Sequence, residues 1–354
     1  MKCHWFLRSA SRWLSLLLFA VSSPQSLREA ANSHNLLAGT AVRPSLFTEA
    51  AYSATLAREF NMVEAEDAMK WWALRQKQDA FDFREGDEVV QFAQAHGMKV
   101  RGHCLVWDHN NPDWLAAGHF NPQQLSYLLR EHIFTVMKHY EGSVFAWDVV
   151  NEALDENGRF KDSPWYNQPG IGFAEKDSAY VEQAFRWARE ADPKSQLFYN
   201  DNGAEGLGRK SDAVYAMVKD FKQRGVPIDG VGLQMHVTGV DLDTEAIAKN
   251  IARLAALGVQ VHITELDVSL PVDSSGKASN DDLKAQADIY RRVVRACLNS
   301  SACTSVQAWG FTDKYSWIGS HSHHTRGAAL LFDNTYKPKP AYQAMVKELA
   351  ASPK

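Results

Sequence analysis

Residues 145–152 read Phe-Ala-Trp-Asp-Val-Val-Asn-Glu, a short run rich in apolar and aromatic residues that ends on two polar side chains, Asn151 and Glu152. A run of this length and composition predicts a buried β-strand. Segments with helical periodicity flank it at residues 122–139 and 176–190. The stretch therefore predicts one strand of a parallel sheet that alternates with helices, with its polar groups at the carboxyl end.

The same alternation runs along the chain of 354 residues from residue 36 onward, without a linker. The predicted strands lie at residues 36–42, 60–63, 99–106, 145–151, 196–200, 230–236, 260–265 and 305–311. Further predicted helices lie at residues 85–96, 207–224, 244–257, 281–298 and 340–349. Eight such units predict an α/β fold with a single domain, a (β/α)8 TIM barrel. The alternative is an open doubly wound sheet, but the first predicted strand is not followed by the GxGxxG loop usual in that fold.

Composition and charge restrict the class of function. Hydrophobic residues make up 45% of the chain and charged residues 23%, which supports a large core and excludes global disorder. The 38 Lys and Arg residues against 42 Asp and Glu residues give a net charge of −4, so we expect no nucleic-acid partner. Because no P-loop, HExxH or paired CxxC motif occurs, we expect no cofactor and no bound metal.

Three histidines near the carboxyl end are the candidates for a metal site. His321, His323 and His324 are metal ligands by residue type. The alternative, which we favour, is a polar loop at the rim of a cleft.

The amino-terminal segment has the pattern of a secretory signal. Three cations precede a short apolar run at residues 13–21, and small residues follow. This order predicts a signal peptide at residues 1–23 and a mature barrel at residues 24–354, secreted to the cell exterior or the periplasm. The run is too short to span a bilayer, so we expect no membrane association after cleavage. The alternative is a buried amino-terminal helix.

The cysteines fit an exported protein. Cys297 and Cys303 lie six residues apart after a helical pattern, and export permits a disulfide between them. The alternative is two separate thiols. Cys104 would remain unpaired, as a small buried apolar residue.

The carboxyl ends of the predicted strands carry polar and aromatic groups, and this is where barrels of this kind place their catalytic residues. Glu152 ends the fourth strand and Glu265 the seventh. Two carboxylates facing each other across a cleft suit glycoside hydrolysis, in which one protonates the leaving oxygen and the other attacks or activates water. The alternative for each glutamate is an ordinary ion pair at a strand end.

Neighbouring residues support that chemistry. The amide of Asn151 could bind a sugar 2-hydroxyl, and that bond strengthens in an oxocarbenium-like transition state. His236, at the end of the sixth strand, could hydrogen-bond Glu265 and keep it ionised, while Asp267 orients the histidine. We also expect mutual repulsion between the two carboxylates to raise the pKa of the acid.

Five motifs make the resemblance specific. The segments WDVVNEALDENG, ITELDV, GHCLVW, GLQMH and WGFTDKYSW resemble glycoside hydrolase family 10, the retaining endo-β-1,4-xylanases, over residues 36–349. The resemblance implies that Glu152 is the acid/base and Glu265 the nucleophile. It implies a separation of about 5–5.5 Å between their carboxyl groups, as in retaining enzymes. It further implies sugar contacts from Glu66, Asp67, Lys70, His103, Trp107, Asn151, Gln234, His236, Trp309 and Trp317. For His103 the alternative is a core histidine.

Several positions depart from the family pattern. Asp67 stands where an asparagine is usual, and Trp72 where an acidic residue is usual. Asp108-His109-Asn110 replaces the common His-Ser-Gln after Trp107. These changes border sugar-binding positions, so they bear on substrate decoration, chain length and pH dependence.

The resemblance implies a monomeric enzyme that acts on xylan or xylo-oligosaccharides. One alternative is a related retaining glycanase that acts on another β-1,4-glycan such as glucan. Another is a non-catalytic xylan-binding or inhibitor protein on the same barrel. Among the tryptophans, Trp147 and Trp187 are predicted to pack in the core, whereas Trp71 and Trp72 are left open.

Overall fold

The computed structural model describes residue 1, residues 26–173 and residues 177–351. The predicted signal peptide, apart from residue 1, lies outside the described residues. The barrel strands are β1 (Leu37–Val42), β2 (Met62–Ala65), β3 (Lys99–Val106), β4 (Ala146–Asn151), β5 (Gln196–Asp201), β6 (Gly230–Leu233), β8 (Gln260–Pro271) and β9 (Cys303–Ala308). Eight parallel strands thus occupy the places that the sequence pattern predicts.

The strands close into a barrel. Each pairs in parallel with the next in chain order from β1 to β6, β6 pairs with β8, and β8 with β9. β9 also pairs with β1, with Leu37 opposite Ser305, which completes the ring. The prediction of a (β/α)8 barrel is therefore confirmed, and the open-sheet alternative is wrong.

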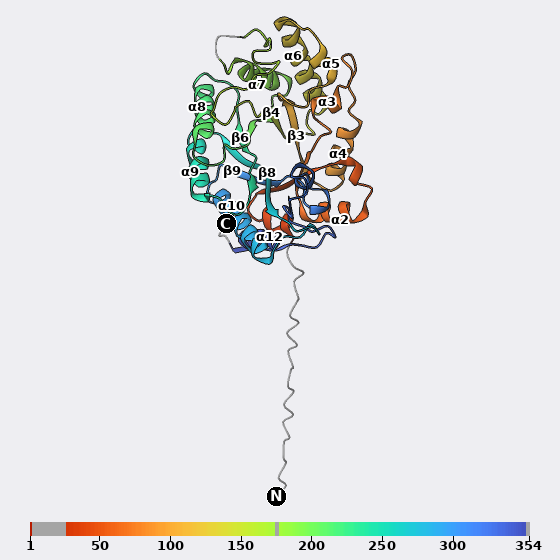
Figure 1. Ribbon diagram of the computed structural model, residues 1–354, viewed down its shortest axis with the longest axis vertical. Coiled ribbons are helices and arrows are strands. Elements are labelled where there is room, and N and C mark those ends of the chain that lie inside the picture. Colours follow the sequence, from red (N-terminus) through yellow and green to blue (C-terminus); the bar gives the residue numbers. More distant parts are fainter. Residues whose placement is uncertain (2–25, 174–176, 352–354) are drawn as a thin grey trace.

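Helices surround the strands, as Figure 1 shows. They are α1 (Leu27–Asn32), α2 (Ala50–Glu59), α3 (Trp71–Leu74), α4 (Arg84–Ala95), α5 (Asp113–Ala117), α6 (Pro122–His139), α7 (Ala179–Ala191), α8 (Arg209–Gln223), α9 (Thr244–Ala255), α10 (Asn280–Leu298), α11 (Ile318–His321) and α12 (Pro340–Ala351), with short 3-10 turns η1 (Pro44–Leu46) and η2 (Asp313–Tyr315). The start of α6 shows how local chemistry fixes an end: the Asn121 side chain accepts from the Gln124 N–H, and Pro122 follows at the first helical position.

Most strands differ from their predicted bounds by one to three residues, and two differ in their pairing, both beside the polar strand ends. The predicted strand at 230–236 is divided into β6 and a short β7 (His236–Thr238), because Met235 adopts a left-handed conformation with φ of 69°. β8 runs on to Pro271 because β7 and a two-residue β10 (Arg326–Gly327) pair with its second half. These local pairings depend on distant segments, so a strand's own sequence does not predict them.

A disulfide joins Cys297, near the end of α10, to Cys303, at the start of β9. This confirms the predicted pairing. Cys104 is an unpaired, buried thiol in β3, also as predicted.

The aromatic core settles the open question about two tryptophans. Trp147 and Trp187 are buried, as predicted. Trp71 is buried too, with its ring stacked on His132 and on Trp165 at centroid distances of 3.9 and 4.8 Å. Trp72, one position later on α3, is 39% exposed. Trp71 is therefore a packing residue.

Over the described ranges, the helices are too short or too polar for any of them to be a candidate membrane span.

Candidate active site

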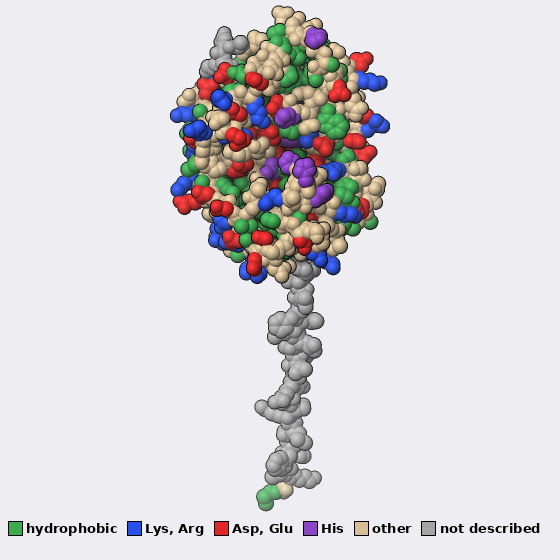
Figure 2. All heavy atoms as spheres, in the orientation of Figure 1, with side chains coloured by type: hydrophobic (Ala, Val, Ile, Leu, Met, Phe, Trp, Pro, Cys, Tyr) green, Lys and Arg blue, Asp and Glu red, His purple; other side chains and the backbone are tan. Residues whose placement is uncertain are grey.

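The predicted site residues gather at the carboxyl ends of the barrel strands. Glu152 follows β4, Gln234 follows β6, His236 begins β7, and Glu265 lies within β8. In Figure 2, drawn in the orientation of Figure 1, histidine and acidic side chains gather near the middle of the face. Side chains that are far apart in the sequence therefore meet over one mouth of the barrel.

Glu152 is held by three neighbours and by its own backbone. Its Oε1 accepts from Gln234 Nε2 at 2.9 Å, and its Oε2 accepts from Trp107 Nε1 at 3.2 Å. Lys161 Nζ lies 3.5 Å from the same Oε2. The backbone adopts a left-handed φ of 54°, which is uncommon outside glycine and clusters at functional sites.

The charge state of Glu152 differs from the expectation drawn from the sequence. Burial favours a raised pKa, but hydrogen bonds from Gln234 and Trp107 and the charge of Lys161 outweigh it. The pKa of Glu152 is therefore lowered, whereas repulsion between the two carboxylates was expected to raise it. That expectation is wrong for the free protein, because it left out the donors that surround this carboxylate.

Glu265 lies in a different environment. Its side chain is buried, its Oε1 accepts from Asn200 Nδ2 at 2.7 Å, and its Oε2 accepts from His236 Nε2 at 3.1 Å. His236 in turn bonds Asp267 Oδ2 through Nδ1 at 3.0 Å, and Trp317 Nε1 donates to that same oxygen at 2.8 Å. The imidazole thus lies between two carboxylates.

This arrangement keeps His236 charged. Burial alone lowers the pKa of an imidazole, but Asp267 and Glu265 together raise that of His236 well above its ordinary value. Both ring nitrogens then donate, one to each carboxylate. Glu265 therefore faces a cation, His236, as well as an amide donor, Asn200.

Amide side chains connect the two glutamates. Asn151 Oδ1 accepts from Gln234 Nε2 at 3.2 Å and from Asn200 Nδ2 at 2.9 Å. Gln234 also donates to Glu152, and Asn200 also donates to Glu265. Since both of these donors use the oxygen of Asn151, its own amide nitrogen is the group left to face a ligand.

The other predicted sugar-binding residues fall into two groups. Lys70 Nζ lies 5.3 Å from the ring centroid of Trp107 and 5.7 Å from that of Trp309, so these three lie together at the site. Glu66 and Asp67 instead face cations: Glu66 forms a two-pronged pair with Arg43, and Asp67 accepts from Lys70 at 2.9 Å.

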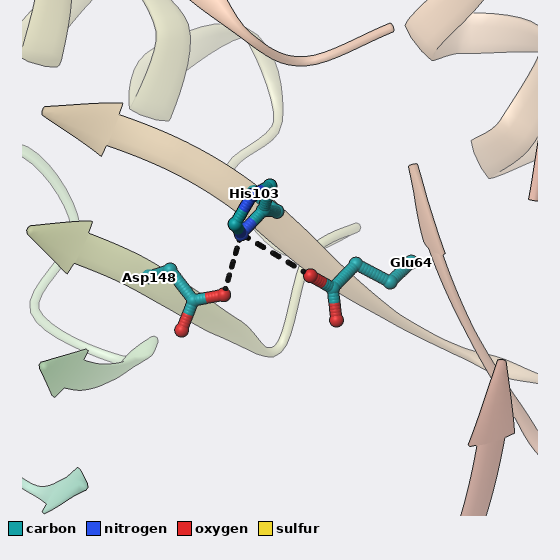
Figure 3. Close-up of side chains that lie close together, drawn as sticks. All are labelled: Glu64, His103 and Asp148. Carbon is teal, nitrogen blue, oxygen red and sulfur yellow. Dashed lines mark hydrogen bonds and ion pairs between the residues drawn. The ribbon is translucent and has the colours of Figure 1, made fainter. Parts of the chain in front are cut away.

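His103 is buried in a charged cluster inside the barrel. Figure 3 shows its ring between the carboxylates of Glu64 and Asp148, with Nδ1 at 3.3 and 3.0 Å from their oxygens. Arg101 pairs with Asp148 and lies 3.7 Å from Glu64. Burial raises the pKa of Glu64. His103 thus has the contacts of a core histidine, although its ring also packs edge-on against Trp309 at 5.3 Å.

Glu64, His103 and Asp148 are also the only group of three potential metal ligands, within the described part of the chain, whose donor atoms lie close together. Two internal cations, Arg101 and the histidine when protonated, already balance both carboxylates. A metal ion would have to displace them from a buried position, so the residues present do not favour one. The rim histidines 321, 323 and 324 do not form such a group.

Sequence reasoning missed four contributors to this site. Asn200, at the end of β5, bonds both Asn151 and Glu265, and its position at a strand end was the available signal. Arg101 and Asp148 are charged residues inside strongly apolar strands, which marks a buried pair. Lys161 lies in a loop, where no periodicity relates it to Glu152.

His236→Asn tests the cation beside Glu265. Glu265 loses a charged hydrogen-bond donor, so we expect kcat/KM on xylo-oligosaccharides to fall by about tenfold or more. Because the pKa of His236 is raised on folding, the stability it contributes is complete below about pH 6.5 and is lost as pH rises through the folded value. The stability difference between the wild type and the variant should therefore shrink at alkaline pH, as measured by urea unfolding.

His139→Asn is the matched control, because His139 also pairs with a carboxylate, Asp87 at 2.7 Å, but on outer helices. It should leave the activity profile in place. An unchanged kcat/KM in His236→Asn would contradict the assignment.

A closed (β/α)8 barrel with two differently solvated carboxylates, amide donors and tryptophans at its strand ends defines the class of barrel glycoside hydrolases. The sequence profile of glycosyl hydrolase family 10 matches residues 26–348, and the chain belongs to that family. The predicted resemblance is confirmed.

Relatives agree over nearly the whole described chain. Endo-1,4-beta-xylanase B of Thermotoga neapolitana is 40% identical over 298 residues, which cover 84% of this chain and 83% of that protein. The crystal structure of native xylanase 10B from Thermotoga maritima is similar with a TM-score of 0.87 and 39% identity, over 92% of this chain and 98% of that one. The crystal structure of xylanase 10B from Thermotoga petrophila RKU-1, in complex with xylobiose, is similar with a TM-score of 0.86 and 39% identity, over 92% of this chain and 97% of that one.

Proposed function

We propose that this protein is an endo-1,4-β-xylanase that hydrolyses internal β-1,4-xylosidic bonds of xylan with net retention of configuration. The observation that carries the proposal is the unequal solvation of two carboxylates in a family 10 barrel. Glu265 is buried against a cation and an amide donor, whereas Glu152 is at the cleft surface beside Trp107. One group is thus suited to attack as the nucleophile and the other to exchange a proton.

In the first step, Glu265 attacks the anomeric carbon while Glu152 gives its proton to the departing glycosidic oxygen. The bond between that carbon and oxygen breaks, and an ester to Glu265 forms. In the second step, the ionised Glu152 takes a proton from water as the water oxygen attacks the same carbon and displaces Glu265. Two inversions give retention. The separation of about 5–5.5 Å between the carboxyl groups remains a prediction.

The lowered pKa of Glu152 in the free protein fits the second step directly. For the first step Glu152 must be protonated. A sugar chain that fills the cleft removes water from this carboxylate, and desolvation favours the neutral acid. Substrate binding is therefore expected to raise the pKa of Glu152, which the free site lowers.

Around this pair, we propose that the free amide nitrogen of Asn151 binds the sugar 2-hydroxyl. Lys70, Trp107, Trp309 and Trp317 would bound the sugar beside the scissile bond, with Gln234 and His236 holding the carboxylates in place. We retain Glu66, Asp67 and His103 as residues that shape this side of the cleft through their contacts with Arg43, Lys70 and Asp148.

Product analysis tests the substrate. Xylose lacks the hydroxymethyl group of glucose. A cleft closed by Lys70, Trp309 and Trp317 leaves little room for that group. We expect the protein to release xylo-oligosaccharides of mixed length from xylan, initially as the β-anomer by NMR, and to release little sugar from carboxymethylcellulose. Hydrolysis of cellulose alone would identify a glucanase. Binding to xylan without release of reducing sugar would identify a non-catalytic protein.

We further propose that the protein is exported, with residues 1–23 as the signal and residues 24–354 as the mature monomer. The basic and apolar order of the first residues supports this, and so does the Cys297–Cys303 disulfide, since such bonds persist in oxidising compartments. Amino-terminal sequencing of the protein from a culture medium or periplasmic extract tests the boundary. Size-exclusion chromatography tests the monomer.

A further inference from the structure

A second carboxylate and a lysine lie beside Glu152 and take no part in the mechanism above. Lys161 Nζ is 3.5 Å from Glu152 Oε2 and 3.9 Å from Asp108 Oδ2. Lys161 comes from the connection between β4 and α7, and Asp108 directly follows Trp107 after β3. One ammonium group therefore lies between the carboxylate of the site and another carboxylate from a different loop.

Local backbone contacts hold both residues at this position. The Lys161 N–H donates to the carbonyl of Ala153, one residue after Glu152, at 2.9 Å, which returns the chain to the site. On the other side, Asn111 Nδ2 donates to the carbonyl of Asp108 at 3.1 Å. The contact is thus built by two anchored turns.

The three charges are only partly exposed to water. The side chains of Asp108 and Glu152 are each 14% exposed and that of Lys161 is 25% exposed. Asp108 Oδ1 is buried and finds no hydrogen-bond partner among the residues that the structure describes. Burial raises the pKa of Asp108, and Lys161 opposes that rise. At these distances and exposures, each charge affects its neighbours more strongly than a surface ion pair does.

We propose that Asp108 and Lys161 are positioning residues that together set the charge state of the acid/base Glu152. Lys161 stabilises the ionised form of Glu152. Asp108 opposes this, because it draws the ammonium group toward itself and adds a negative charge nearby. The proposal rests on the proposed role of Glu152, and it deepens that role.

The pair acts on both halves of the reaction. Formation of the glycosyl ester needs a protonated Glu152, which Lys161 disfavours and Asp108 favours. Hydrolysis of that ester needs an ionised Glu152, which Lys161 favours and Asp108 disfavours. The balance between the two residues therefore sets the pH at which neither step is slow.

Other titratable groups face these residues and stay unchanged in the test. Asp201 on β5 affects Glu152, and burial raises its pKa to about 7 although Lys210 lies 3.0 Å away. The buried thiol of Cys104 lies on β3. His109 Nε2 is 3.7 Å from Asp108 Oδ2.

Two single variants should act in opposite directions. In Lys161→Met, Glu152 loses a cation, so the alkaline limb of kcat/KM on xylo-oligosaccharides should move to higher pH by about one unit. In Asp108→Asn, Lys161 is left to Glu152 alone, so that limb should move to lower pH. The double variant should lie between them, and Lys161→Arg should stay near the wild type. Lys138→Met, which removes a lysine paired with Glu141 on the surface, is the matched control.

A dinitrophenyl β-xylobioside provides a second readout, because its leaving group needs no proton. With this substrate, the two variants should no longer shift the alkaline limb of kcat/KM, which reports the ester-forming step. Shifts in the same direction in both variants, or unmoved limbs in variants that keep the wild-type melting temperature, would overturn the proposal.

Carbon NMR titration of the Glu152 carboxyl group, identified with Glu152→Gln, measures the same effect without activity. If Lys161→Met and Asp108→Asn shift the pKa of Glu152 in opposite directions but the protein does not hydrolyse xylan, the proposed function is refuted and the inference stands. If the protein hydrolyses xylan but the two variants cause no such shifts, the inference is refuted and the proposed function stands.

Discussion

Glu265→Gly is expected to lower kcat on xylan by about 10⁴-fold or more, the scale on which hydrolases lose activity without their nucleophile. Asn200 and His236 both hydrogen-bond this carboxylate, so its loss leaves two donors without their acceptor. The space left by the side chain admits azide. With a dinitrophenyl β-xylobioside, azide should restore turnover and give the α-glycosyl azide, since one displacement inverts the anomeric carbon.

The matched control is Glu59→Gln, which alters an equally buried glutamate on α2, outside the site. The Oε2 atom of Glu59 accepts from the Tyr342 hydroxyl, on α12, at 2.7 Å. This variant should change stability and leave kcat in place. A β-configured azide from Glu265→Gly, or activity on xylan within about tenfold of the wild type, would show that Glu265 is not the nucleophile.

Glu152→Ala should lower kcat/KM on xylan by about 10²- to 10⁴-fold, the usual contribution of general acid–base catalysis. On the dinitrophenyl substrate the first step should persist, because that leaving group departs unprotonated, and the glycosyl ester should accumulate as a burst. Azide should then attack the ester from the face that Glu152 served and give the β-glycosyl azide. The alkaline limb of the pH profile should also disappear.

Glu156→Gln is the control for this variant. Glu156 lies on the same loop and pairs with Lys210 at 3.2 Å, but its side chain is largely exposed. An equal loss on both substrates in Glu152→Ala would indicate a defect in binding or folding instead of a lost proton donor.

The sequence predicts the fold of this protein well because the barrel repeats one local pattern. Each of the eight barrel strands and most of the longer helices are visible in the spacing of their own residues, and the polar strand ends converge whenever such strands close into a ring. The same argument brings Glu152, Glu265, Asn151 and His236 to one mouth of the barrel. These features need no knowledge of contacts between specific atoms.

What the sequence does not predict depends on contacts between loops and on electrostatic balance. Lys161 reaches Glu152 through a loop that a backbone hydrogen bond returns to Ala153, and no periodic pattern of residues predicts that bond. The pKa of Glu152 results from opposing effects of burial and of several donors. A pattern of residue types identifies the participants but not the sum of their effects. Trp71 was undecided for a related reason, since its stacking on His132 and Trp165 joins three separate segments.

The hydrogen-bonded path between the two glutamates runs through Gln234, Asn151 and Asn200. All three are carboxamides, which neither gain nor lose a proton in the physiological range. The path therefore fixes the spacing of the two acids but does not relay protons between them. A histidine in the middle of that path would let the acids equilibrate, and each could then take the other's role. With amides in the path, two chemically identical side chains keep different roles: Glu152 exchanges protons and Glu265 attacks the sugar.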